Sequence, residues 1–279
     1  ADYLDDGTKI QAKIIIKSED KTINSTKAII DFSGTDDQHE NDTLNAALSV
    51  TKSAVLYVLK VITGVNIPLN SGCLFPVEII IPEKSILNPA YPAPVATGNV
   101  ETSQRIVDVL LALFKVAAAS QGTMNNFLFE IDGDTPYYET IAGGSGATET
   151  NDGATGVQVH MTNTRITDPE ILEHRHPGLR LKQFSIRKHS GGKGKHNGGD
   201  GLIREFEFIK PANVSILSER RKYAPYGLNE GQPGKCGENI LIKENGAIEK
   251  LPHRITTNIS PGESIIIKTP GGGGTGKPS

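Results

Sequence analysis

The sequence predicts an α+β fold, with a mixed sheet and two longer helices in the N-terminal part and a mostly antiparallel β C-terminal part. Two segments repeat apolar residues at a spacing of roughly 3.6, which predicts helices. Most of the remaining chain consists of short Ile- and Val-rich runs between glycine and polar turns, which predicts strands. The 30 glycines and the 5% aromatic content favour a loop-rich fold with an aliphatic core over a helical bundle.

Strands are expected wherever a short apolar run lies between turn residues. These runs lie at 9–17, 28–32, 75–81, 127–131, 137–141, 157–162, 182–187, 202–209, 213–218, 240–243, 255–259 and 264–268. The first two form a hairpin across the polar turn at 18–22. The regular spacing beyond residue 179 predicts a sandwich- or barrel-like part. The chain therefore divides into an α+β part at 1–178 and a β-rich part at 179–279, or forms one continuous domain.

Two helices complete the N-terminal part. The first is expected at about 42–62, with its N-cap at residue 41 or 42 and its end at Gly64. The second begins near Asn99, where the carboxylate of Glu101 suits the positive N-terminal end of a helix.

Composition excludes several classes of protein. The net charge of −3 and the lack of a long basic run argue against nucleic-acid binding. No apolar run reaches the ~18 residues of a membrane span, and the acidic N-terminus lacks a signal-peptide core. Cys73 and Cys236 are too few for a disulfide framework, which favours a reducing compartment. We therefore expect a cytoplasmic protein that binds neither nucleic acid nor membrane.

Polar side chains gather in short segments between residues 121 and 163. Strand alternation at 157–162 would place Gln158, His160 and Thr162 on one face, where His160 could act as an acid or a base. The alternative for His160 is a hydrogen-bonded structural role. If the segments share one site, six residues should converge, namely Asn125, Asn126, Glu139, His160, Thr162 and Asn163. The alternative is a buried polar network in which these residues satisfy one another.

Glycine-rich loops are the other candidates for binding. Consecutive backbone N–H groups at 143–147 and at 190–201 can form anion-binding nests, although a solvated turn is the alternative. At the first loop, Gly143, Gly144, Ser145 and Gly146 are expected to hold a carboxylate. The tail at 271–278 nearly matches a phosphate-binding P-loop, but Pro278 stands where Ser or Thr is required. We expect a flexible end or a glycine turn there.

Metal and thiol chemistry are weakly indicated. His174 and His176, with one nearby glutamate, supply too few ligands for a zinc site, so no metal site is predicted in this chain. Cys73 and Cys236 have no CxxC spacing and no adjacent histidine that would activate a thiolate.

The order and spacing of many short strings resemble the hydantoinase B / 5-oxoprolinase family over nearly the whole chain. These strings are DFSGT (31–35), PAPV (92–95), GNVETSQR (98–105), GTMNNF (122–127), GGSGA (143–147), DG (152–153), HMTN (160–163), DPE (168–170), GGDG (198–201) and TPGGGG (269–274). The GTMNNF and HMTN to DPE strings are most similar to the 5-oxoprolinase branch. The chain departs from the family pattern at KHN (195–197) and at SER (218–220), which puts anion binding by those loops in doubt.

The resemblance implies part of an ATP-dependent enzyme that opens a cyclic amide, either 5-oxoproline or a hydantoin. The chain would be the C-terminal half of the hydantoinase B-like part and inactive alone. ATP with Mg²⁺ would be bound by a hydantoinase A-like subunit or domain, in an oligomer, and metal ligands would lie in the upstream part. Glu139 or His160 would direct a water. Alternatives are a scaffold that docks the ATP-using subunit, and a subunit of an ATP-dependent ketone carboxylase.

Overall fold

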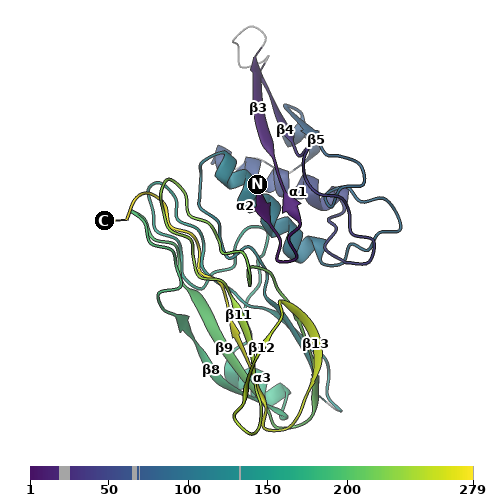
Figure 1. Cartoon of the computed structure of the whole chain (residues 1–279), viewed down its shortest axis with the longest axis vertical. Helices are drawn as coiled ribbons and strands as arrows, with labels where there is room; N and C mark the ends of the chain where they lie inside the picture. The colour runs from purple at the N-terminus through teal and green to yellow at the C-terminus, as the bar shows by residue number, and fades with distance from the viewer. Residues whose placement is uncertain (19–25, 65–67, 69, 132, 279) are drawn as a thin grey trace. The chain divides into compact units, whose positions relative to one another are not determined.

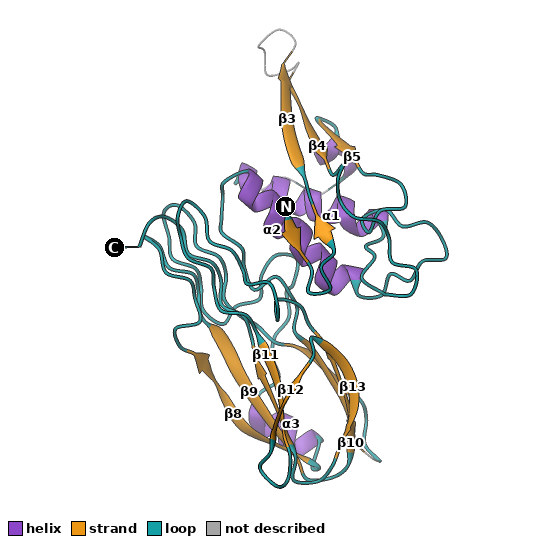
Figure 2. Ribbon diagram, in the orientation of Figure 1, coloured by secondary structure: helices purple, strands orange, loops and turns teal. Residues whose placement is uncertain are grey.

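The computed structural model describes residues 1–18, 26–64, 68, 70–131 and 133–278, drawn in Figures 1 and 2. The fold is α+β, as the sequence predicts. The chain forms two compact units, Ala1–Val116 and Ala117–Ser279. This division lies earlier than the expected boundary at 178/179, because strands within 126–140 pair with strands of the C-terminal part. None of the described helices is both long and apolar enough to cross a lipid bilayer.

The sheet of the first unit is mixed, as expected. The strands of this unit are β1 (Asp2–Tyr3), β2 (Lys9–Ile10), β3 (Lys13–Ser18), β4 (Thr26–Asp31) and β5 (Val77–Ile80), and the mixed sheet consists of β3, β4 and β5. β3 and β4 pair antiparallel, which confirms the hairpin, and β4 pairs parallel with β5. β1 and β2 form a separate antiparallel pair. The polar turn predicted at 18–22 lies, beyond Ser18, outside the described residues.

The first long helix, α1 (Leu48–Thr63), begins later than predicted and ends where predicted. Gly64 follows it in the left-handed conformation, with φ 63° and ψ 0°. The late start has a local cause at Asn45, whose amide nitrogen donates to the carbonyls of His39, Asp42 and Pro94 at 2.8, 3.1 and 2.8 Å. This buried side chain therefore holds residues 42–46 in a loop.

The second long helix, α2 (Ser103–Leu113), follows directly on a π-helical turn at Gly98–Thr102. Gly98 is required there, because a Cβ at that position would lie 2.1 Å from the carbonyl oxygen of Asn45. Arg105 is fully buried and forms an ion pair with Asp2 at 3.5 Å. Residues 101–105 of this string are therefore packed inside the protein.

The second unit is a sandwich of two antiparallel sheets. One, the β10 sheet, has the order β13-β10-β6-β7, and the other, the β9 sheet, has the order β12-β11-β14-β9-β8. The elements are β6 (Asn126–Ile131), β7 (Tyr137–Thr140), α3 (Pro169–Arg175), β8 (Leu179–Arg187), β9 (Gly201–Phe208), β10 (Ala212–Leu217), β11 (Glu238–Ile242), β12 (Ile248–Leu251), β13 (Arg254–Ile259) and β14 (Ser264–Lys268). Phe127, Phe129, Phe206 and Phe208 pack in its core, with Phe127 and Phe206 stacked at 4.4 Å between ring centroids.

One end of the sandwich continues into a bundle of extended glycine-rich loops, which Figure 2 shows side by side. We call it the glycine bundle; its segments are 117–122, 142–147, 153–157, 190–201, 224–235 and 269–276. Backbone hydrogen bonds join them, for example from Gly272 N–H to the Gly199 carbonyl and from Gly199 N–H to the Ser145 carbonyl, both at 2.9 Å. Residues 271–274 are buried within it, which excludes a flexible tail.

The bundle depends on the absence of side chains. A Cβ on Gly272 would lie 1.9 Å from the Ser145 carbonyl oxygen, and one on Gly144 equally close to that of Gly199. Real Cβ atoms do not approach backbone so closely, so these positions require glycine for space. The high glycine content therefore reflects backbone packing more than turns.

We expect Gly272→Ala to lower the free energy of unfolding by about 3 kcal/mol or more, because the added methyl group overpacks rigid backbone. Gly246→Ala is the control, since its Cβ meets nothing within 4 Å although its φ is +80°. Only the strain of the left-handed conformation, about 1 kcal/mol, is expected there. Urea unfolding followed by circular dichroism measures both, and equal losses would contradict the packing argument.

Candidate functional site

The segments that carry the predicted site residues meet at the ends of β6 and β7. In the antiparallel register Asn126 lies opposite Thr140, and Phe127 lies opposite Glu139. The side-chain amide of Gln158 donates to the carbonyl and to the hydroxyl of Thr140, at 3.2 and 3.1 Å. The chain at residue 158 therefore lies beside the end of β7.

The side chain of Asn125 is buried and hydrogen-bonds to three other residues. Its amide nitrogen donates to Gln121 Oε1 at 2.8 Å and to the Ile141 carbonyl at 3.1 Å, and its Oδ1 accepts from Arg221 Nη1 at 2.7 Å. Arg221 also donates to Asn239 Oδ1, at 2.9 Å from Nη2. With φ at 45°, Asn125 also makes the backbone turn into β6. Its polar groups are therefore used within the protein.

Asn126 is buried next to it and is also engaged. Its Oδ1 accepts from the hydroxyl of Tyr138 at 2.5 Å, and its amide nitrogen lies 3.4 Å from the Leu217 carbonyl. Asn125 and Asn126 thus match the buried-network alternative in this conformation.

Glu139 forms a buried, bidentate ion pair with Arg204 of β9. Arg204 Nε donates to Glu139 Oε1 at 2.8 Å, and Nη2 donates to Oε2 at 3.0 Å. The hydroxyl of Tyr137 donates to Oε2 at 2.8 Å. Both side chains of the pair are at most 4% exposed. The guanidinium also lies over the rings of Phe184 and Phe206, at 4.9 and 5.2 Å. The pair therefore links the two sheets inside the sandwich.

Burial sets the protonation of this cluster. It raises the pKa of Glu139, while the charge and hydrogen bonds of Arg204 and the hydroxyl of Tyr137 oppose the rise. Burial also raises the pKa of Tyr137 to about 12, and the negative charge of Glu139 adds to this. Tyr137 is therefore a neutral donor at neutral pH. Because both oxygens of Glu139 accept charge-assisted hydrogen bonds, its carboxylate is committed to the ion pair.

His160, Thr162 and Asn163 do not lie on a strand. Val157 makes a single bridge to Gly143, and the chain then turns at His160, whose φ is +57°. The strand predicted at 157–162, with its alternating faces, is therefore wrong. The physical reason is local: the left-handed backbone conformation at His160 cannot continue an extended strand. His160 and Thr162 are partly exposed and Asn163 is exposed.

The N–H groups of the loop at 143–146 are already hydrogen-bonded. Gly143, Gly144 and Ser145 donate to the carbonyls of Val157, Pro270 and Ala154, at 3.3, 3.0 and 3.0 Å. Gly146 donates to the hydroxyl of Ser120 at 3.0 Å. The expected carboxylate-binding nest at Gly143, Gly144, Ser145 and Gly146 therefore has no donors to spare in this conformation, because the bundle uses them.

The second loop does form a nest, and its anion comes from the chain itself. Ser190 and Gly191 N–H both donate to Asp200 Oδ1 at 2.8 Å, and His189 N–H donates to Oδ2 at 3.1 Å. The nest geometry predicted for 190–201 is thus present, and the carboxylate of Asp200 fills it.

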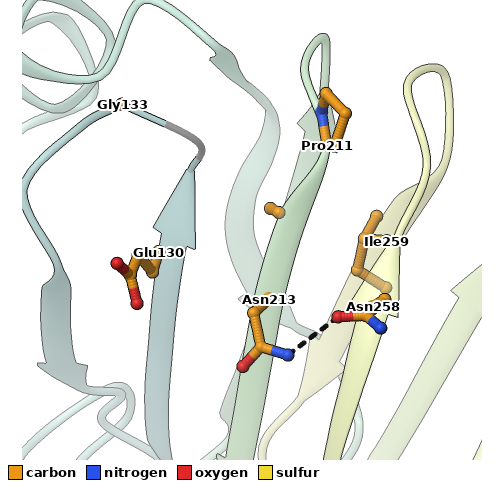
Figure 3. A pocket seen from close by; sticks show the side chains of 7 residues that line it. Glu130, Gly133, Pro211, Asn213, Asn258 and Ile259 are labelled. Carbon is orange, nitrogen blue, oxygen red and sulfur yellow. Dashed lines mark hydrogen bonds between the residues drawn. The ribbon is translucent and has the colours of Figure 1, made fainter.

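Two surface pockets lie away from the six residues that were expected to converge. Figure 3 shows one of about 290 Å³ at the outer face of the β10 sheet, where Glu130, Asn213 and Asn258 project from neighbouring strands. Asn213 Nδ2 donates to Asn258 Oδ1 at 2.9 Å. A second pocket, of about 340 Å³, is lined by Asp152 and Asp200, among others. Neither of these two pockets is lined by the six residues expected to converge or by the loop at 143–146, whereas the loop at 190–201 lines the second.

Of the two histidines considered for zinc, His176 contacts an aspartate and an aromatic ring. His176 Nδ1 lies 2.9 Å from Asp134 Oδ2, and its ring stacks edge-on against Phe129 at 5.1 Å. Within the part of the chain that the structure describes, no three His, Cys, Asp or Glu side chains are arranged to hold a metal ion.

Sequence reasoning missed Arg204, Arg221 and Asp200. The sequence did contain a sign of the role of Arg204. Alternation along β9 places Arg204 on the same face as Leu202 and Phe206, where a charged residue needs a buried partner. For Arg221 there was no such sign, since Asn125 and Asn239, its partners, are distant in the sequence. Asp200 lies within the loop predicted as a nest, 9 to 11 residues from the N–H groups that donate to it.

We expect Glu139→Gln to lower the free energy of unfolding by about 3–5 kcal/mol, because it leaves the buried guanidinium of Arg204 without a counter-charge. Glu207→Gln on β9, which removes the partly exposed partner of Lys182 on the neighbouring strand β8, should cost about 0–1 kcal/mol. Urea unfolding at neutral pH measures both. A loss at Glu139 no larger than at Glu207 would mean that the buried pair is not a structural anchor.

Solved structures with the same fold include two ATP-dependent enzymes. The ATP-dependent caprolactamase from Pseudomonas jessenii aligns with a TM-score of 0.79 at 21% identity, over 97% of this chain and 49% of that one. A nucleotide-free acetone carboxylase aligns with a TM-score of 0.79 at 19% identity, over 96% of this chain and 41% of that one. At these identities the likeness shows the fold.

Sequence relatives are closer. The chain is 50% identical to 5-oxoprolinase 1 of Arabidopsis thaliana and to the 5-oxoprolinase of Dictyostelium discoideum, in each case over 99% of this chain and 21% of the relative. It is 28% identical to a putative D-/L-hydantoinase component of a Pseudomonas species, over 92% of this chain and 46% of that one. The chain thus spans about a fifth of the length of the 5-oxoprolinases it matches.

A match to the Hydantoinase B/oxoprolinase family covers residues 1–278. Together with the relatives, this match shows that the chain belongs to the hydantoinase B/5-oxoprolinase family.

Proposed function

We propose that this chain is part of an ATP-dependent cyclic-amide hydrolase that opens 5-oxoproline to glutamate. The observation that carries the proposal is the 50% identity to two 5-oxoprolinases over 99% of the chain. A hydantoin is the second substrate class, on the weaker likeness of 28% identity to a putative D-/L-hydantoinase component.

The chemistry explains why such an enzyme needs ATP. A five-membered lactam is a poor electrophile, and phosphorylation of its carbonyl oxygen makes the ring carbon open to attack by water. We assign ATP and Mg²⁺ to a hydantoinase A-like subunit or domain. This chain would then orient the activated ring and the water, which is catalysis by positioning and by charge stabilisation.

Within this proposal the residues take different roles. His160, with Thr162 and Asn163, contributes partly exposed polar groups that can reach a ring and its water. Glu139 acts through its ion pair with Arg204, whose Nη2 lies 3.4 Å from the Thr167 carbonyl and so ties down the chain beyond His160. Asn125, Asn126 and the loop at 143–146 shape the neighbouring backbone.

A scaffold function is the alternative. One observation favours it: the polar groups of Asn125, Asn126 and Glu139 are engaged within the protein. On this alternative the chain docks an ATP-using subunit, and the reacting groups lie elsewhere.

We expect the protein that contains this segment, with its ATP-using part, to release phosphate and glutamate together when given ATP and 5-oxoproline. The 279-residue chain alone should do neither. Phosphate release and glutamate formation are measured in parallel, with a reaction lacking 5-oxoproline as control. Glutamate formed by the chain alone would contradict the division of labour, and phosphate release without any lactam opening would contradict the hydrolase proposal.

His160→Gln in the complete enzyme should lower kcat about 100-fold, the effect typical of losing a general acid or base. His174→Gln is the matched control, because His174 is an exposed histidine at the end of α3. Steady-state kinetics and thermal unfolding should show a rate loss at His160 without a matching loss of stability. Full activity of His160→Gln would remove His160 from the mechanism and favour the scaffold.

A further inference from the structure

The second pocket, at the glycine bundle, is lined by carboxylate, ammonium, amide and imidazole groups. It has a volume of about 340 Å³, and it is formed by two loops of the second unit, at 152–155 and 189–200. Six polar residues of its lining matter here, namely Asp152, Thr155, His189, Lys193, Asn197 and Asp200. A volume near 300 Å³ is at the lower limit of small-molecule sites, which suits a ligand of amino-acid size.

The wall of this pocket is pre-organised. Asp200 is held by the N–H groups of His189, Ser190 and Gly191, at 3.1, 2.8 and 2.8 Å. Asp152 Oδ1 accepts from the Asn197 N–H at 2.8 Å. Gly153 and Gly198, which also line the pocket, pack in the bundle, where a Cβ would lie 2.1 and 2.0 Å from a carbonyl oxygen. Both carboxylates therefore project from backbone that is held rigidly in place. This rigidity lowers the conformational entropy that the protein loses when a ligand binds.

Several groups in the pocket remain uncommitted. Among the described residues, Asp152 Oδ2, Lys193 Nζ, the amide nitrogen of Asn197 and the ring of His189 form no hydrogen bond. Thr155 Oγ1 accepts from the Asp200 N–H at 3.0 Å, which leaves its own O–H to donate. The pocket thus offers carboxylate acceptors and several donors side by side.

The charges decide the class of ligand. Two carboxylates, one ammonium group and the ring of His189 line the pocket, and His196 Nδ1 lies 3.6 Å from Asp152 Oδ1. With both histidines neutral, a phosphate or nucleotide would meet more negative than positive charge. A ligand with a cationic group satisfies Asp152 and Asp200. Lys193, Asn197 and Thr155 can donate hydrogen bonds to an acceptor on the same ligand. A carboxylate is the strongest acceptor for such donors.

We propose that this pocket binds a free α-amino acid, with its ammonium group between Asp152 and Asp200 and its carboxylate toward Lys193. The site lies outside the residues assigned to lactam opening. A neutral zwitterion fits the net charge of the lining better than an acidic amino acid does. L-glutamine is therefore the probe, and two analogues isolate its charges: glutaramate lacks the ammonium group, and 4-aminobutanamide lacks the carboxylate.

Isothermal titration of the 279-residue chain with L-glutamine, without ATP or 5-oxoproline, tests the proposal. Saturable binding is expected, with both analogues weaker by about tenfold or more, the effect of losing one charged hydrogen-bonding group. Asp152→Asn and Lys193→Met should each weaken L-glutamine binding to a similar extent. Glu244→Gln, which removes an exposed carboxylate from a turn away from the pocket, should leave it unchanged.

Three results would overturn the proposal: no binding of L-glutamine up to about 10 mM, equal binding by Asp152→Asn, or glutaramate binding as tightly as L-glutamine. Inorganic phosphate competing for the pocket would overturn the charge argument. The analogues test the ammonium and carboxylate on the unaltered chain, so the proposal stays falsifiable even if a variant fails to fold. Because no turnover is measured, failure here leaves the hydrolase proposal untouched.

Discussion

The contact of backbone with backbone in the glycine bundle is the constraint on which the second unit depends. Carbonyl oxygens of one segment occupy the space that side chains of the next would need, as at Gly144, Gly199 and Gly272. The N–H groups and carbonyls of these segments satisfy one another across the bundle, so the loops bury their polar backbone without forming a sheet. The bundle therefore turns what would be mobile loops into a rigid extension of the sandwich.

That rigidity has a chemical consequence. A nest of N–H groups is a general anion site, and here the nest at 189–191 holds Asp200 instead of a ligand. The N–H groups at 143–146 are likewise consumed by the bundle. The glycine-rich loops thus act mainly by presenting side chains at fixed positions, and the acidic pocket next to Asp152 is the clearest product of this arrangement.

Inside the sandwich, polar residues perform a second structural task. Glu139 and Arg204 join the two sheets through an ion pair whose hydrogen bonds are complete on the carboxylate side. Asn125 joins the turn before β6 to Arg221 and, through it, to Asn239 of β11. The same fold occurs in a caprolactamase and in an acetone carboxylase at about 20% identity. Because one fold occurs in such different enzymes, the fold by itself does not identify a substrate.

Local patterns in the sequence were enough for the α+β class, the hairpin of β3 and β4, the end of α1 at Gly64 and most strands of the sandwich. Each of these depends on residues close together in the chain, through apolar periodicity or one turn residue. The order of the short strings also identified the family. None of this required knowledge of contacts between distant segments.

Only the tertiary structure decided what the polar residues do. Glycine repeats look alike whether they form turns, nests or a packed bundle, and the difference arises from the segments that lie against them. From the sequence Glu139 is a candidate catalytic carboxylate, and only the fold shows that Arg204, distant in the sequence, forms an ion pair with it. His160 lies outside any strand, because the chain turns there in the left-handed backbone conformation. The physical reason is common to the glycine loops and Glu139: a polar group takes its role from its hydrogen-bond partners, and here the partners are brought together by folding.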